Sequence, residues 1–87
     1  MKAVVLYHPQ SDHARLVEEF ARDFQKAEVG RRIELVGIDN KEGAAMATLY
    51  DVTQYPAVLA IANDGRLLNL WVGQLPLMNE VAAYTQD

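Results

Sequence analysis

Hydrophobic and polar residues follow one another in blocks along the first third of this chain. The run from Ala3 to Tyr7 is continuously apolar and rich in β-branched residues, which is typical of a buried central strand. Between Asp12 and Ala27, apolar residues recur at helical spacing with charged residues between them, and predict an amphipathic helix. Ser11 or Asp12 would cap the start of this helix, and Gly30 would follow its end. Its expected apolar side consists of Leu16, Val17, Phe20, Ala21 and Phe24.

The rest of the chain predicts two more helices and three more strands. A strand is expected from Ile33 to Ile38, and a helix from Lys41 to Tyr50. The turn signal Asn63-Asp64-Gly65 separates the apolar runs Ala57 to Ala62 and Leu67 to Val72, and so predicts a β-hairpin. A last helix is expected after Pro76. The residues expected to face inward from the last two helices are Ala45, Met46, Leu49, Tyr50, Leu77, Met78, Val81, Ala82 and Tyr84.

This order of elements predicts the fold class. A helix joins the first two strands, which indicates a right-handed parallel crossover, whereas the hairpin makes the last two strands antiparallel. We therefore expect an α/β fold of the order βαβαββα, with a four-stranded mixed sheet and helices on both of its faces. Residues 1–87 are expected to form a single domain.

Composition narrows the possible partners. The formal net charge is -4 and the basic residues are scattered, so neither nucleic acid nor an anionic membrane is an expected partner. No apolar stretch approaches the roughly 20 residues that span a bilayer. The opening residues do not resemble a signal peptide, which favours a cytoplasmic location. The sequence contains no cysteine, and this excludes disulfides, thiolate nucleophiles and thiolate metal sites.

The second half of the chain resembles a thioredoxin. The resemblance lies in the run Leu49 to Val58 with its Tyr55-Pro56-Ala57 core, in the hairpin turn, and in Gly73 after the last strand. The order of the elements extends the similarity over nearly the whole chain, and the resemblance implies a cis peptide bond before Pro56. It also implies a shallow groove beside Tyr55 and Pro56, which in thioredoxins presents free backbone groups to an extended peptide.

The reactive centre of the thioredoxin family is missing from this chain. The family's Cys-x-x-Cys motif lies where the first strand meets the first helix, and the matching window here is Ser11-Asp12-His13-Ala14. Serine and alanine replace the two sulfurs, and the buried acidic residue of the first strand is also absent. The resemblance therefore implies a redox-inactive member with no catalytic residue, no cofactor and no metal.

A second resemblance keeps an enzymatic alternative open. Leu6-Tyr7-His8-Pro9-Gln10-Ser11 is similar to the first loop in the amino-terminal domain of glutathione transferases. That likeness implies a glutathione- or thiol-binding site in which Ser11 or Tyr7 stabilises a thiolate. However, the Glu-Ser pair that this family places after the hairpin is replaced by Leu68-Asn69-Leu70-Trp71.

Other readings of the first loop are weaker. Ser11, Asp12 and His13 do not make a catalytic triad, because adjacent residues entering a helix point in different directions. His8, Asp12 and His13 lack the spacing and the fourth ligand of a known metal site. We therefore expect a non-catalytic module that recognises a protein or peptide, as a monomer or weak homodimer. Its expected groove consists of His8, Pro9, Ser11, Asp12, Ala14, Tyr55, Pro56 and Gly73.

Overall fold

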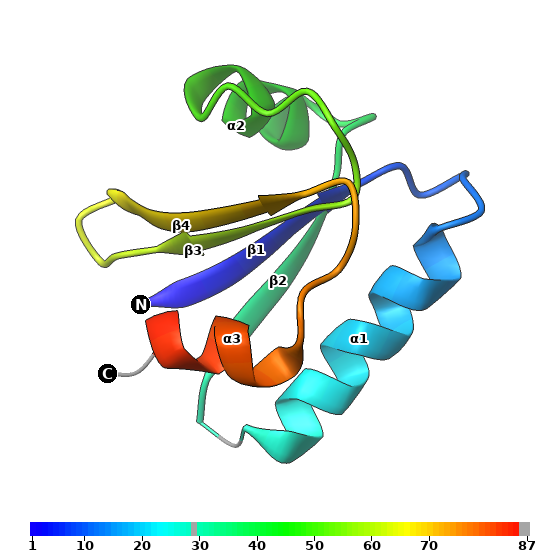
Figure 1. Cartoon of the computed structure of the whole chain (residues 1–87). Coiled ribbons are helices and arrows are strands. Elements are labelled where there is room, and N and C mark those ends of the chain that lie inside the picture. The colour runs from blue at the N-terminus through cyan, green and yellow to red at the C-terminus, as the bar shows by residue number, and fades with distance from the viewer. Residues whose placement is uncertain (29, 86–87) are drawn as a thin grey trace.

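The computed structural model describes residues 1–28 and 30–85. In this part of the chain, four strands and three helices follow one another in the predicted order (Figure 1). The strands are β1 (Lys2–Tyr7), β2 (Arg32–Gly37), β3 (Ala57–Ile61) and β4 (Leu67–Val72), and the helices are α1 (Ala14–Ala27), α2 (Lys41–Leu49) and α3 (Met78–Tyr84).

The strands form one mixed sheet in the order β2-β1-β3-β4. β1 runs parallel to β2 and antiparallel to β3, and β4 returns antiparallel to β3. β1 and β3 lie in the centre, and their apolar runs are buried on both sides, as expected for central strands. The parallel crossover and the hairpin are thus confirmed, and the fold is α/β with a thioredoxin-like βαβαββα topology.

α1 and α3 cover one face of the sheet (Figure 1). The core on this face joins alternate residues of β1, including Val5, to Val17 and Phe24 of α1 and Val81 of α3. Val17 and Phe24 are fully buried, and the Phe20 ring stacks on Phe24 with centroids 6.3 Å apart. Large side chains therefore fill the layer between α1 and the sheet.

α2 covers the opposite face, and here a helix meets the sheet through its backbone (Figure 1). The Asn40 side chain caps α2 by accepting a hydrogen bond from the Gly43 amide at 2.8 Å. A Cβ atom on Gly43 would overlap the carbonyl of Gly37, the last residue of β2. Only glycine allows this close approach.

The start of α1 corrects one prediction. The helix begins at Ala14 rather than Asp12, its N-cap residue is His13, and no side chain caps it. Ser11 does not cap α1, because its hydroxyl donates instead to the His8 carbonyl at 2.7 Å. Short-range hydrogen bonds within the loop between β1 and α1 therefore compete with helical ones, and the helix begins only at Ala14.

Some of the expected inward-facing residues are exposed. In α2, Ala45 and Leu49 face solvent, whereas Met46, Ala47 and Tyr50 pack on the core. The inward side is the one that carries Gly43, so these residues follow it at spacings of three and four. In the last helix, Leu77 and Tyr84 are 67% and 41% exposed. Leu77 is the extended N-cap residue of α3 and does not belong to its inward face.

Candidate functional site

The loop that follows β1 is held by hydrogen bonds between its own residues. The His8 amide donates to the Nε2 atom of His13 at 3.1 Å, and the Ser11 hydroxyl donates to the His8 carbonyl. The Ala14 amide donates to the Ser11 carbonyl at 3.2 Å, which leads the chain into α1.

The β1–α1 loop meets the segment before β3 through aromatic rings. The rings of His8 and Tyr55 contact edge to face, with centroids 5.0 Å apart. The Tyr55 hydroxyl donates to the Val52 carbonyl at 3.2 Å, which fixes the ring in place. The Tyr55–Pro56 peptide bond is cis. His8 and Tyr55, which the sequence analysis assigned to one groove, are therefore in contact.

Pro56 and Gly73 are held together at the end of the hairpin. The Gly73 amide donates to the Pro56 carbonyl at 3.0 Å. Gly73 has a φ of 86°, a left-handed conformation that favours glycine. A Cβ atom at this position would also lie 3.2 Å from Oε1 of Gln54. Gly73 therefore lets the chain leave β4 close to the proline.

An open groove of about 430 Å³ runs between α1 and the segment that follows β4. Most of its exposed lining is apolar, with Leu16 and Phe20 on the helix side and Pro56 and Leu75 on the other. The complete lining consists of His13, Leu16, Glu19, Phe20, Asp23, Pro56, Gly73, Gln74 and Leu75. Leu16 is 60% exposed, although it lies on the apolar side of the amphipathic helix α1.

Two carboxylates lie along the α1 side of this groove, and its lining includes no lysine or arginine. Glu19 forms an ion pair with Arg15 at 3.4 Å, and Asp23 forms a longer one with Arg22 at 3.9 Å. All four side chains are substantially exposed, and such pairs contribute little to stability. The carboxylates thus remain available to a positively charged ligand group.

The structure brings only some of the predicted site residues together. Pro56 and Gly73 line the groove, whereas His8 and Tyr55 contact each other and are not part of its lining, and Tyr55 packs on the core of the α2 face. Pro9 packs against Gly37, since a Cβ there would lie 2.6 Å from the proline ring. The remaining three are the buried Ala14 at the start of α1, Ser11 bonded within its loop, and the exposed Asp12.

Sequence reasoning missed most of the α1 side of the groove. Leu16 and Phe20 were assigned to the core by their spacing, yet Leu16 is largely exposed and Phe20 is only half-buried. Leu75 was not singled out. The signal in the sequence was the wide apolar side of α1, whose large side chains Leu16 and Phe20 are not fully covered by the sheet.

Tyr7 ends β1 and directly precedes the β1–α1 loop. It is buried, with 8% of its surface exposed, and its ring lies 6.5 Å from that of His13. Burial raises the pKa of the Tyr7 hydroxyl above its usual 10.0, and the negative charges of Glu18 and then Asp39 raise it further. Both causes keep the proton on this phenol.

Metal ligands are not grouped in this part of the molecule. Across residues 1–28 and 30–85, no three histidine, aspartate or glutamate side chains are arranged to hold a metal ion. None of the helices in these ranges is both long and apolar enough to cross a membrane.

Comparison of the chain with models of known protein families, and with curated protein sequences, gave no match.

Proposed function

We propose that this chain is a redox-inactive member of the thioredoxin-like proteins that binds an extended peptide segment of a partner protein. The observation that carries the proposal is the apolar groove between α1 and the Pro56–Gly73 contact. It adjoins the cis proline, where the thioredoxin resemblance places peptide binding, and the chain contains no cysteine. Binding without chemistry is the role that remains for such a site.

The groove favours a particular kind of peptide. Leu16, Phe20 and Leu75 offer apolar contact for one large aliphatic or aromatic side chain. Glu19 and Asp23 lie along the same groove and would attract a lysine or arginine next to that side chain. We therefore propose a ligand in which an apolar anchor is flanked by basic residues, consistent with the net charge of -4.

The glutathione-binding alternative draws less support. A hydroxyl that stabilises a thiolate must donate its proton to the sulfur, and a serine has only one proton to donate. The Ser11 proton is already directed to the His8 carbonyl. Tyr7 is buried, and its raised pKa suits a structural phenol better than an accessible donor.

A cytoplasmic location of the protein stays a prediction from the sequence.

An amide NMR titration of the labelled protein tests the proposal. The probe is a pool of extended peptides that carry a central leucine or phenylalanine between lysine and arginine residues, and reduced glutathione is titrated separately. We expect shifts at Leu16, Phe20, Gly73 and Leu75 with the peptides and none with glutathione. Shifts with glutathione alone, centred on Ser11 and Tyr7, would support the transferase-like alternative instead.

A pair of leucine variants separates groove binding from nonspecific apolar binding. Leu16→Glu adds a carboxylate inside the groove and should abolish the shifts caused by an apolar anchor. Leu49→Glu is the matched control, because Leu49 is 73% exposed on α2, on the opposite face of the sheet. If both variants bind the peptides as the unchanged protein does, the groove is not the binding site.

A further inference from the structure

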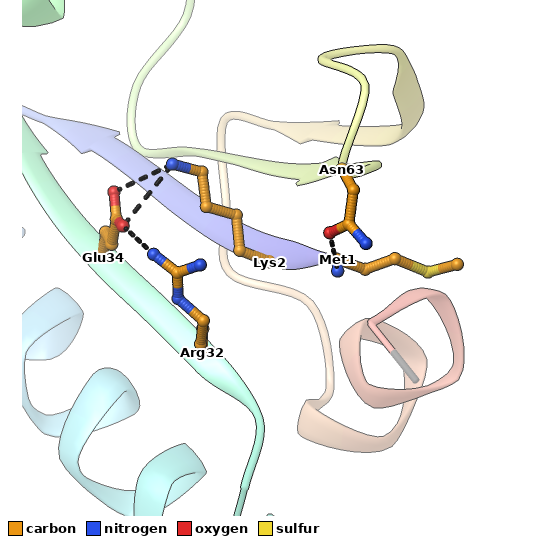
Figure 2. A network of polar contacts seen from close by, with 5 residues as sticks. All are labelled: Met1, Lys2, Arg32, Glu34 and Asn63. Carbon is orange, nitrogen blue, oxygen red and sulfur yellow. Dashed lines mark hydrogen bonds and ion pairs between the residues drawn. The ribbon is translucent and has the colours of Figure 1, made fainter. Parts of the chain in front are cut away.

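The two outer strands of the sheet differ in how they are protected. β2 carries Arg32 and Glu34, and Glu34 also pairs with Lys2 of the adjacent strand β1 (Figure 2). The Glu34 carboxylate lies 3.3 Å from the Lys2 nitrogen and 3.1 Å from Arg32. Charged side chains of this kind keep an edge strand from pairing with another chain. β4, Leu-Leu-Asn-Leu-Trp-Val, contains neither a charged residue nor a proline.

The register of β4 shows which of its backbone groups face outward. Bonded and non-bonded residue pairs alternate along an antiparallel ladder. The Gly73 amide donates to the Pro56 carbonyl, so this is a bonded pair, and two residues back Trp71 also bonds to β3. The N–H and C=O groups of Leu70 and Val72 are therefore directed away from β3, along the open edge of the sheet.

One of these outward groups is already engaged by a neighbouring side chain. The Leu70 amide donates to Oδ1 of Asn69 at 2.8 Å. This bond is possible because the amide does not take part in the β3–β4 ladder. Asn69 thus occupies a donor that a further strand would use.

Five of the six side chains of β4 are apolar, and all six are at least partly accessible. Val72 is 42% exposed. A hollow of about 360 Å³ extends the edge toward the start of α3. Its lining includes Trp71, Val72 and the largely exposed Leu77, together with the polar residues Gln74 and Glu80. The Trp71 ring also contacts Tyr84 of α3, with centroids 5.7 Å apart. Backbone groups and apolar surface are therefore offered together.

We propose that β4 pairs with β4 of a second copy of this chain, antiparallel about a two-fold axis. This goes beyond the proposed peptide binding and uses a different surface. Each chain carries a net charge of -4, so two copies repel each other in general. An uncharged strand is the stretch where they can meet without opposed like charges. Leu70 would face Leu70 of the second copy, and each would donate to the other's carbonyl, as a self-complementary interface requires.

The dimer should be concentration-dependent. Paired strands cover less than the roughly 800 Å² per partner that is typical of stable complexes. Sedimentation equilibrium of the full chain from micromolar to millimolar concentration tests this. We expect an apparent mass that rises toward twice that of one chain. Hydrogen exchange at the Leu70 and Val72 amides should slow over the same range, which would place the contact on β4.

Three variants make the test specific. Val72→Lys places a charge on the edge and should raise the dimer dissociation constant about tenfold or more. Leu49→Lys on α2 is the matched control and should dimerise like the unchanged protein. Asn69→Ala frees the Leu70 amide and should lower the dissociation constant about fivefold.

Val72→Lys should weaken the dimer and Asn69→Ala should strengthen it, and a variant that merely unfolds cannot produce the second result. A monomeric mass at every concentration, in both the unchanged protein and Asn69→Ala, would overturn the proposal. A dimer that Val72→Lys leaves intact would also overturn it, because the contact would then lie on another surface.

Discussion

The two faces of the sheet hold their helices in different ways. On one face, α1 is separated from β1 by a layer of large side chains, with Phe24 and Val17 fully buried. On the other face, α2 lies so close to β2 that Gly43 contacts the Gly37 carbonyl through its backbone. The first arrangement leaves apolar side chains at the rim, where Leu16 and Phe20 line the groove. The candidate binding surface thus lies on the face where side chains, rather than backbone, set the distance between helix and sheet.

Among the variants that test this difference between the two faces, Phe24→Ala should lower the free energy of unfolding most. The ring is fully buried between α1 and the sheet, so its removal leaves a cavity in the side-chain layer. We expect a loss of about 3–5 kcal/mol in the free energy of unfolding, measured by urea denaturation. Leu16→Ala, on the same helix but exposed, is the control and should change it by less than about 1 kcal/mol. Equal losses in both variants would mean that α1 is not held by its buried side chains.

Gly43→Ala should have a smaller effect, through a different mechanism. The new Cβ overlaps the Gly37 carbonyl, and relief requires α2 to shift away from β2. Overpacking of this kind costs about 1–3 kcal/mol, partly offset by the roughly 0.5–1 kcal/mol that alanine gains over glycine in a helix. We expect a net loss in the same urea assay. Ala45→Gly, at an exposed position of α2, measures the propensity effect alone.

A stabilising effect of Gly43→Ala would contradict the backbone contact between α2 and β2. Amide shifts of Gly37 and Ile38 give a second readout, because these residues lie under the helix. They should move in Gly43→Ala and remain in place in Phe24→Ala.

Tyr7→Phe should have the smallest effect, confined to alkaline pH. The folded state holds the Tyr7 proton more tightly than the unfolded chain, since burial and the Glu18 and Asp39 charges raise its pKa above 10.0. Above this value the native state binds more protons than the unfolded state, so stability present at lower pH is lost as pH rises toward the folded pKa. Tyr7→Phe should therefore lose less stability than the unchanged protein as pH rises above about 10.

Tyr84→Phe is the control for Tyr7→Phe, since Tyr84 is partly exposed on α3. Urea denaturation at each pH provides the measurement. The same alkaline slope in Tyr7→Phe and in the unchanged protein would show that Tyr7 does not cause it.

Hydrophobic pattern was sufficient to predict the order of the elements and the layers of this fold. The apolar run Ala3 to Tyr7 and the hairpin turn at Asn63-Asp64-Gly65 each have a single structural reading, and both were confirmed. The start of α1 could not be predicted, because it depends on which acceptor the Ser11 hydroxyl finds. The phase of α2 depends on a glycine that packs through its backbone, and apolar periodicity does not detect such a contact.

The candidate site was predictable in its loops and not in its helix. Pro56 and Gly73 are conspicuous in sequence because their backbones are special, and both line the groove. The opposite wall depends on Leu16, an apolar residue whose spacing matches that of the core. Spacing indicates the side of a helix on which a residue lies, but not how far the neighbouring elements extend over it.

The charged strand β2 has a consequence for how large an assembly can become. A sheet that could be extended at both edges would grow without limit, as fibrils do. In this chain, Lys2, Arg32 and Glu34 lie at the β2 end, and the uncharged strand lies only at the other. Joining two copies through β4 would leave a charged strand at each outer end of the combined sheet. Growth by strand addition would therefore stop at two chains, and raising the concentration would saturate the dimer rather than produce aggregates.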